Sequence, residues 1–227
     1  AVERLALDGG RVTAAVAGDR HFRGDSFVVT LPPQDAPDLA EPGSALREEL
    51  ERWRGLQDAR ALCIDLGFSR RLRDDLVFVF DVRRDLYFSL HSETTPDLAP
   101  EGGQLLHAMA YLSPEEAADD RLNEQRHKEL QDGLDQYFPG WREAAVVNRT
   151  LRSALVTSAR QTPAQQGAAR VPARSGAASN VYFAGDARDL PYNLTETSLA
   201  SALEIADLIG SEAPARAEPA AVTMASR

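Results

Sequence analysis

The segment 180–186, Asn-Val-Tyr-Phe-Ala-Gly-Asp, restricts the possible fold of this chain more than any other stretch. Residues 181–183 are β-branched and aromatic, which is typical of a short buried strand. The apolar run stops at Gly185 and Asp186. We therefore expect a strand whose carboxyl end is a Gly-Asp turn.

A capped helix is expected after this turn and a short loop. Asn193 can cap a helix over residues 194–209, and Glu196 follows it at the spacing of a capping box. Gly210 is a natural stop for the helix. One apolar stripe runs along it, made of Leu199, Leu203, Ala206 and Ile209.

A strand, a Gly-Asp turn, a loop and a capped helix together favour a cofactor site. Glycine lets a bulky ligand approach the backbone. A carboxylate at the end of a strand can accept hydrogen bonds from sugar-like hydroxyls. The helix N-terminus offers N–H groups and a partial positive charge to an electron-rich ligand edge.

This pattern resembles the carboxyl-terminal flavin motif of the flavin amine oxidase and phytoene desaturase group, which closes an FAD site. The resemblance implies that Asp186 binds the ribityl or pyrophosphate part of FAD and that residues 195–198 face the pyrimidine side of the flavin. It also places Tyr192, which follows Pro191, near the flavin. The expected cofactor-binding residues are Gly185, Asp186, Tyr192, Thr195, Glu196, Thr197 and Ser198.

Residues 1–31 predict a β-meander. Asp8-Gly9-Gly10 is a strong hairpin signal, and the apolar run 27–29 ends at Pro32-Pro33. On its own this stretch is compatible with any antiparallel hairpin. The flavin group carries a similar meander followed by a D-x-V-V strand that rejoins the FAD sheet, and residues 25–29 fit that strand.

The middle of the chain predicts a helix over residues 44–60 and then an antiparallel sheet. Its strands are expected at residues 62–68, 76–80, 86–92 and 105–112. Ser113 and Pro114 begin a helix that should reach Tyr137. Residues 145–156 are expected to return toward the FAD region.

The expected fold is therefore α/β with an α+β insert. Segments 1–40 and 145–211 would be parts of a Rossmann-like FAD/NAD(P)-binding domain, incomplete in this chain. Residues 44–144 would form an antiparallel-sheet substrate domain, and residues 212–227 a disordered tail.

No pair of glycines in the sequence has the G-x-G spacing, so the G-x-G-x-x-G fingerprint that admits a dinucleotide pyrophosphate is missing. The chain also begins without an initiator Met and directly on a strand pattern. We expect it to be a fragment, a processed product or one half of a split enzyme. The N-terminal FAD-binding half would then come from elsewhere or from a partner subunit.

Charge and cysteine content narrow the partners and the compartment. A net charge of −10 argues against nucleic acid as a partner. The single cysteine, Cys63, fits a reducing, cytoplasmic compartment. The sequence has no run of 18 apolar residues that could span a membrane.

The remaining reactive side chains form no recognisable site. The four histidines lie far apart in the sequence, which makes a metal site an unfavoured reading. His91 and His107 fall on expected strands and could face a substrate, although a half-exposed strand histidine is the commoner situation. No catalytic acid or base stands out.

The resemblance implies hydride transfer from a substrate C–H bond to flavin, as in desaturases and amine oxidases, with a small and apolar substrate. The alternative is a non-catalytic FAD-fold remnant that acts as a binding or structural subunit. Thr197 and Ala202 favour the alternative, because both stand where the group has glycine.

Overall fold

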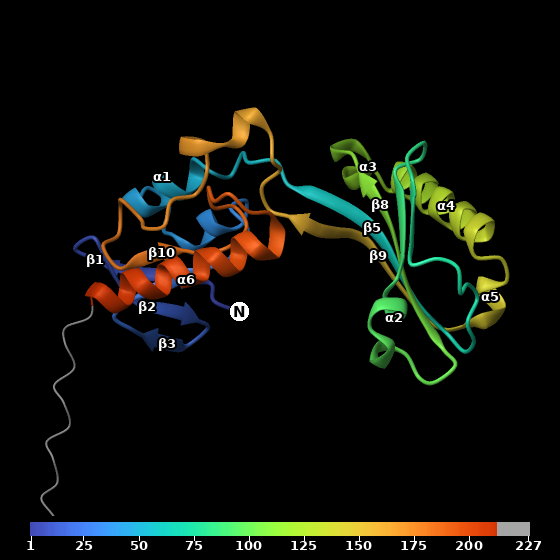
Figure 1. The fold of residues 1–227 in the computed structure, drawn as a ribbon. Coiled ribbons are helices and arrows are strands. Elements are labelled where there is room, and N and C mark those ends of the chain that lie inside the picture. The colour runs from blue at the N-terminus through green and yellow to red at the C-terminus, as the bar shows by residue number, and fades with distance from the viewer. Residues whose placement is uncertain (213–227) are drawn as a thin grey trace, which may run out of the picture. The chain divides into compact units, whose positions relative to one another are not determined.

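The computed structural model describes residues 1–212 and divides into two units, each treated separately below (Figure 1). The first unit combines Ala1–Leu56 with the described chain from Gln161 onward, and the second is Gln57–Arg160. The backbone N–H of Arg160 donates to the carbonyl of Gln57 at 2.6 Å, so the second unit begins and ends at one place. Of the expected disordered tail, only Glu212 is described, and residues 213–227 lie outside the described part of the chain.

The first unit contains the predicted meander. Its antiparallel strands are β1 (Arg4–Asp8), β2 (Arg11–Ala17) and β3 (Arg20–Arg23). The hairpin glycines Gly9 and Gly10 have φ of 54° and 76°, which most residues avoid. The next strand, β4 (Phe27–Val29), leaves the meander and pairs in parallel with β10 (Val181–Phe183). This pair joins the two sequence segments of the unit.

The helices of the first unit are η1 (Ala36–Leu39), α1 (Ala45–Glu51), η3 (Pro163–Gln165), η4 (Gly167–Ala169) and α6 (Leu194–Glu212). Helix α1 is shorter than the predicted helix 44–60. It begins where the Ser44 side chain accepts from the Arg47 N–H, and it ends at Glu51. Beyond it, Trp53 packs edge-on against Phe183 of β10, with ring centroids 5.6 Å apart. The chain turns after Glu51, and this turn lets the Trp53 side chain reach the core at a place where the sequence predicted a continued helix.

The second unit is built on the predicted antiparallel sheet. Its strands are β5 (Ala59–Phe68), β6 (Phe78–Asp81), β7 (Leu86–Leu90), β8 (Gln104–Leu112) and β9 (Ala145–Thr157), in the order β6-β7-β8-β5-β9. Strand β9 corrects the sequence interpretation, because it pairs along β5 and belongs to this unit. Both boundaries between the units therefore lie further along the chain than predicted, so that α1 belongs to the first unit and β9 to the second.

Figure 1 shows α4, the longest helix of this unit, running along one face of the sheet, where its buried residues pack in the core. The helices of the unit are α2 (His91–Thr94), η2 (Pro96–Leu98), α3 (Pro114–Ala118), α4 (Asp120–Tyr137) and α5 (Trp141–Ala144). The single helix predicted after Ser113 is broken at Asp119. That residue is extended, with φ −113° and ψ 114°, and its side chain caps α4 by accepting from the Leu122 N–H at 2.9 Å.

Helix α4 packs tightly on the sheet at Gly133. A Cβ at this position would lie 2.7 Å from Phe88 Cζ and 3.0 Å from Leu86 Cδ1, and both neighbours are fully buried. Overpacking costs about 1–3 kcal/mol, which exceeds the gain of up to about 1 kcal/mol from replacing a helical glycine by alanine. We expect Gly133→Ala to lower the free energy of unfolding of the second unit by about 1 kcal/mol. Urea unfolding followed by Trp141 fluorescence in a Trp53→Phe background measures this unit.

Gly210→Ala in α6 is the matched control, since no atom lies within 4 Å of its Cβ position. Followed by Trp53 in a Trp141→Phe background, it should be neutral or stabilising by up to about 1 kcal/mol. An equal stabilisation by both substitutions would show that α4 does not press on Phe88.

Candidate functional site

The Gly185–Asp186 turn stands at the carboxyl end of a buried strand. All three residues of β10 are buried. Gly185 has a φ of 141°, a conformation that favours glycine. No atom lies within 4 Å of the place where its Cβ would be. The backbone at Gly185 is therefore open to the approach of a ligand.

Ser201 of α6 holds this turn in place. Its Oγ accepts a hydrogen bond from the Gly185 N–H at 2.9 Å and donates to the carbonyl of Ser198 at 2.7 Å. Ser201 is fully buried. Ser201 was not among the residues predicted to form the site. The available signal was the run of small residues at the start of α6.

Arg188 fastens the same turn from its other side. Its guanidinium is 7% exposed and donates to the carbonyl of Phe183 at 3.1 Å and to Glu204 Oε2 at 2.9 Å. It therefore links the end of β10 to the middle of α6. Arg188 therefore has a structural role at this turn.

A charged hollow lies beside the turn. Arg170 is 5% exposed, and its burial lowers the pKa of the guanidinium, while the carboxylates of Asp189 and Asp186 oppose that shift. The hollow has a volume of about 370 Å³. It is lined by Gln161, Gln166, Arg170, Arg188, Asp189, Leu190 and Pro191. The half-buried Asp186 thus interacts electrostatically with Arg170, a buried cation that lines the hollow.

Helix α6 begins at Leu194, as predicted, but it continues through Gly210, the predicted stop, to Glu212. The backbone carbonyl of Asn193 accepts from the N–H groups of Glu196 at 3.1 Å and Thr197 at 3.4 Å. Leu194 itself has a φ of 51°, an unusual conformation for leucine that tends to occur at functional sites. The chain therefore makes a sharp entry into the helix directly after the loop that carries Tyr192.

The predicted site residues separate into exposed and buried groups. Tyr192, Thr195 and Glu196 are exposed, and the Tyr192 carbonyl accepts from Gln161 Nε2 at 3.2 Å. Thr197 is 1% exposed, and its Oγ1 has no hydrogen-bond partner within residues 1–212. Ser198 is half-buried. The Thr197 side chain, which stands where the related motif has glycine, is therefore buried inside the unit and does not project from the exposed start of α6.

The predicted apolar stripe of α6 faces outward except at its last member, Ile209, which is half-buried. Leu199 and Leu203 are 62% and 69% exposed, and Ala206 is exposed as well. The buried face of the helix consists of Thr197, Ser201 and Ile205. Large apolar side chains on the outer face of a helix are typical of an interaction surface.

Asn180 ties the beginning of the Gly-Asp segment to the meander. Its side chain accepts from the Val12 N–H at 2.9 Å and donates to the carbonyls of Val12 at 2.9 Å and Asp25 at 3.0 Å. The residue is 2% exposed. One side-chain amide thus pairs with backbone groups of β2 and of the chain before β4. Because Asn180 directly precedes β10, these bonds also fix the start of that strand.

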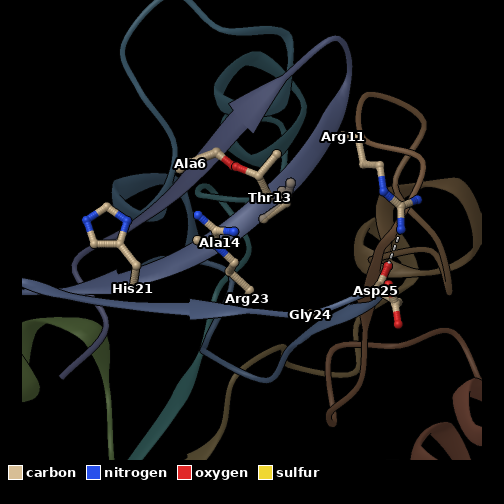
Figure 2. A pocket seen from close by; sticks show the side chains of 9 residues that line it. Ala6, Arg11, Thr13, Ala14, His21, Arg23, Gly24 and Asp25 are labelled. Carbon is tan, nitrogen blue, oxygen red and sulfur yellow. Dashed lines mark hydrogen bonds between the residues drawn. The ribbon is translucent and has the colours of Figure 1, made fainter.

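A second hollow, of about 670 Å³, lies on the meander (Figure 2). Arg11, His21 and Arg23 are among the residues that line it. Arg11 Nη2 donates to the carbonyl of Asp25 at 2.7 Å, which ties β2 to the chain before β4. The hollow is thus bordered by a contact that holds the meander in register with the strand that follows it.

A family model described as "Flavin containing amine oxidoreductase" matches residues 1–210. The chain belongs to the flavin-containing amine oxidoreductase family. This confirms the predicted family and, with it, a flavin as the cofactor of the family. No curated protein matches the chain.

Solved structures agree on the fold. An oxidoreductase from Methanosarcina mazei has a TM-score of 0.66 at 18% identity, over 91% of this chain and 48% of its own. A Pyrococcus furiosus protein has a TM-score of 0.61 at 12% identity, over 95% and 47%. Cyclohexylamine oxidase from Brevibacterium oxydans has a TM-score of 0.55 at 15% identity, over 92% and 48%. The chain spans about half the length of these structures.

Two further features bear on the kind of site. Within residues 1–212, no three side chains of His, Cys, Asp or Glu are grouped so that they could hold a metal ion. The same part of the chain has no helix with the length and apolar character needed to cross a membrane.

Asn180→Ala should destabilise the first unit, because the N–H and the carbonyl of Val12 lose their buried partner, while the Asp25 carbonyl keeps its bond from Arg11. Leaving buried polar groups unpaired costs about 1–3 kcal/mol each, so we expect a loss of roughly 3 kcal/mol. Urea unfolding read from Trp53 in a Trp141→Phe background measures it. Asp207→Ala, at an exposed position of α6, is the control and should change the free energy of unfolding by less than about 0.5 kcal/mol. Equal effects of the two substitutions would refute the bridging role of Asn180.

Proposed function

We propose that this chain is part of an FAD-dependent oxidoreductase that transfers hydride from a substrate C–H bond to the flavin. The observation that carries the proposal is the open Gly185 backbone next to Asp186, held by Ser201 from α6. The family match and the fold of the solved structures support it. The predicted assignment of the FAD-binding role to the first unit and the substrate-binding role to the second is part of the proposal.

The residues present fit one side of an FAD site. Open space beside Gly185 admits a bulky group, and the Asp186 carboxylate can accept hydrogen bonds from ribityl hydroxyls. The exposed start of α6, with Thr195, Glu196 and Ser198, would lie toward the flavin ring. When bound, the flavin supplies the hydride acceptor. This chain's residues would position the cofactor, and Tyr192 would help to exclude water from it.

The rest of the FAD site would come from a segment that carries the G-x-G-x-x-G fingerprint. Within the described residues, β4 pairs only with β10, while the other edge of β10 is met by Arg174. Parallel strands occur almost only in larger sheets that are covered on both faces. Val28 of β4 is 45% exposed. We infer that a strand from the missing segment pairs with the open edge of β4, which would complete the Rossmann-like domain.

The outward face of α6 would be a second part of the same interface. Leu199 and Leu203 are its large apolar side chains. A partner, either the N-terminal half of the same polypeptide or a separate subunit, would bury them. The substrate would be a small, apolar molecule, and the single buried cysteine, Cys63, is consistent with a cytoplasmic location.

The alternative function is a non-catalytic FAD-fold remnant that acts as a binding or structural subunit. Ala202 supports it, because this residue adds a methyl group on the exposed side of α6 where the related motif has glycine. Thr197 carries less weight for the alternative, since its side chain is buried within the unit. The two functions differ in whether the assembled protein holds a flavin.

Asp186→Ala tests the FAD site. The protein should be purified with the chain that carries the G-x-G-x-x-G segment, reconstituted with FAD and examined by absorbance. The native assembly should be yellow and bleach with dithionite. Loss of a hydrogen bond to a charged acceptor costs about 1.5–3 kcal/mol, so the substitution should weaken flavin binding roughly ten- to a hundredfold.

Asp207→Ala is the matched control, since Asp207 is an exposed carboxylate on α6 itself. It should leave the flavin bands unchanged. A native assembly that stays colourless with excess FAD would refute the catalytic proposal and leave the structural alternative.

Leu203→Glu tests the α6 interface. The side chain is 69% exposed, so the substitution should change the stability of the isolated chain by less than about 0.5 kcal/mol. Burying an unpaired carboxylate in an interface costs several kcal/mol, so association with the complementary segment should weaken about tenfold or more. Calorimetry or co-purification would measure it.

Val2→Glu serves as the control, because Val2 is a 45% exposed apolar residue next to the meander. It should leave association unchanged. If Leu203→Glu binds the complementary segment as tightly as the native chain, the outward face of α6 is not part of the interface.

A further inference from the structure

A polar row crosses the face of the second unit's sheet opposite α4. The strand register places Ser89 beside His107, His107 beside Asp65, and Asp65 beside Arg149, on four neighbouring strands. Opposite residues in an antiparallel pair share one face of the sheet and lie about 4.5–5.5 Å apart at Cβ. The sequence separates these residues widely, so only the register brings them together.

Apolar rows flank the polar row on both sides. The row on one side consists of Phe80, Tyr87, Met109, Cys63 and Leu151. The row on the other side contains Leu105, Gly67 and Val147. This face therefore presents a narrow polar line within a largely apolar surface.

The centre of the polar row is an Asp–His pair. His107 Nδ1 lies 2.5 Å from Asp65 Oδ1, and Arg149 Nε lies 3.4 Å from Asp65 Oδ2. Because a carboxylate can only accept, Nδ1 carries the proton of this hydrogen bond. In the neutral ring Nε2 is then an acceptor with a fixed orientation. The His107 side chain is 28% exposed, so a ligand can reach it.

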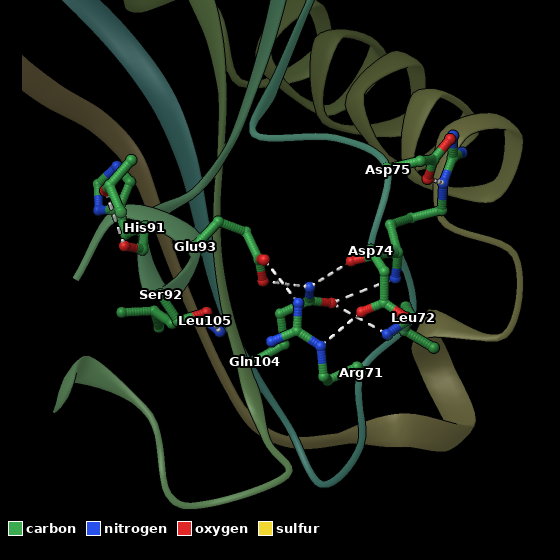
Figure 3. Close-up of polar contacts among 11 residues, drawn as sticks. Arg71, Leu72, Asp74, Asp75, His91, Ser92, Glu93, Gln104 and Leu105 are labelled. Carbon is green, nitrogen blue, oxygen red and sulfur yellow. Dashed lines mark hydrogen bonds and ion pairs between the residues drawn. The ribbon is translucent and has the colours of Figure 1, made fainter. Parts of the chain in front are cut away.

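His91 and a buried glutamine hold this arrangement from the side. The ring of His91, at the start of α2, stacks on His107 with centroids 5.7 Å apart. Figure 3 shows the contacts that fix α2: Gln104 Nε2 donates to Glu93 Oε1 at 2.7 Å, and the Leu105 N–H donates to Ser92 Oγ at 3.0 Å. Gln104 is 1% exposed. These bonds attach α2, and with it His91, to strand β8.

An apolar pocket of about 270 Å³ adjoins the polar row, with Asp65 in its wall. Phe68, Leu98, Pro100, Leu105, Val146 and Val147 supply its apolar lining. The loop that closes it is tightly seated, since a Cβ at Gly103 would lie 2.9 Å from the Phe68 carbonyl oxygen. Pockets that bind small molecules typically have such mostly apolar walls and a few fixed polar groups.

We propose that this face of the second unit binds a small molecule with an apolar body and one hydrogen-bond donor, a hydroxyl or an amino group. The apolar body enters the pocket beside Val147, and the donor binds the Asp65–His107 pair. The proposal deepens the proposed function, because it names the class of substrate and the residues that recognise it. A ligand with a carboxylate in place of the donor is rejected, since it has no proton for His107 Nε2 and is repelled by Asp65.

The test is a proton NMR titration of the full chain with benzyl alcohol, benzylamine, benzoate and toluene. The chain has only four histidines, so their imidazole signals can be assigned by single substitutions such as His107→Gln. Benzyl alcohol and benzylamine should shift the His107 and His91 signals and leave those of His21 and His127 in place. Benzoate should shift none, and toluene should bind about tenfold more weakly than benzyl alcohol.

Two substitutions separate the parts of the site. Asp65→Asn should weaken benzyl alcohol binding about tenfold, while Asp97→Asn, an exposed carboxylate in the same unit, should not change it. Val147→Asp places a charge in the pocket wall at a position that is 57% exposed, and it should abolish binding without unfolding the chain.

Equal affinity for all four probes, or shifts spread over all histidines, would overturn the proposal. So would His107 shifts that follow protein concentration alone, because a second copy would then cover this face. The titration needs no flavin. A colourless assembly would therefore refute the flavin proposal and leave this one standing, and a failed titration with a yellow assembly would do the reverse.

Discussion

The first unit depends on the hydrogen bonds that the side-chain amide of Asn180 makes. It satisfies both backbone groups of Val12 and the carbonyl of Asp25, and it stands directly before β10. Without it, the buried N–H and carbonyl of Val12 would lose their partner where the meander meets the parallel pair β4–β10. Because β10 leads into Gly185 and Asp186, the placement of the candidate cofactor site follows from a hydrogen-bonded link between segments that lie far apart in the sequence.

Local signals predicted the meander, β10, the start of α6 and the antiparallel sheet. Each rests on short-range chemistry, such as the Gly9-Gly10 hairpin and the apolar run before Gly185. The side on which α6 is buried could not be predicted in this way. Leu199 and Leu203 form the most apolar stripe, yet Thr197 and Ser201 are buried, because Ser201 serves the Gly185 N–H. The orientation of α6 goes together with the hydrogen bond between Ser201 and Gly185, and the helical periodicity of the sequence does not reveal such a bond.

Pairing between distant strands accounts for the other differences. Residues 145–157 are a long strand, and nothing in their own composition shows that β5 is their partner. The same holds for Asp65 and His107: both were visible in the sequence, but their contact depends on the register between β5 and β8. Sequence patterns thus identified the Gly-Asp segment, a contiguous candidate for a cofactor motif, and missed the polar row, which is assembled across four strands.

The first unit is interrupted by the whole of the second, whose ends are joined by the bond from Arg160 to Gln57. Closing a flexible loop of that length costs of order 4 kcal/mol in chain entropy. If the second unit folds first, the contacts within its sheet offset this entropy. Its folding then holds the two segments of the first unit near each other, which gives them a high effective concentration. The second unit thus holds the two segments of the first unit together, and the hydrogen bonds of Asn180 form between segments that are already close in space.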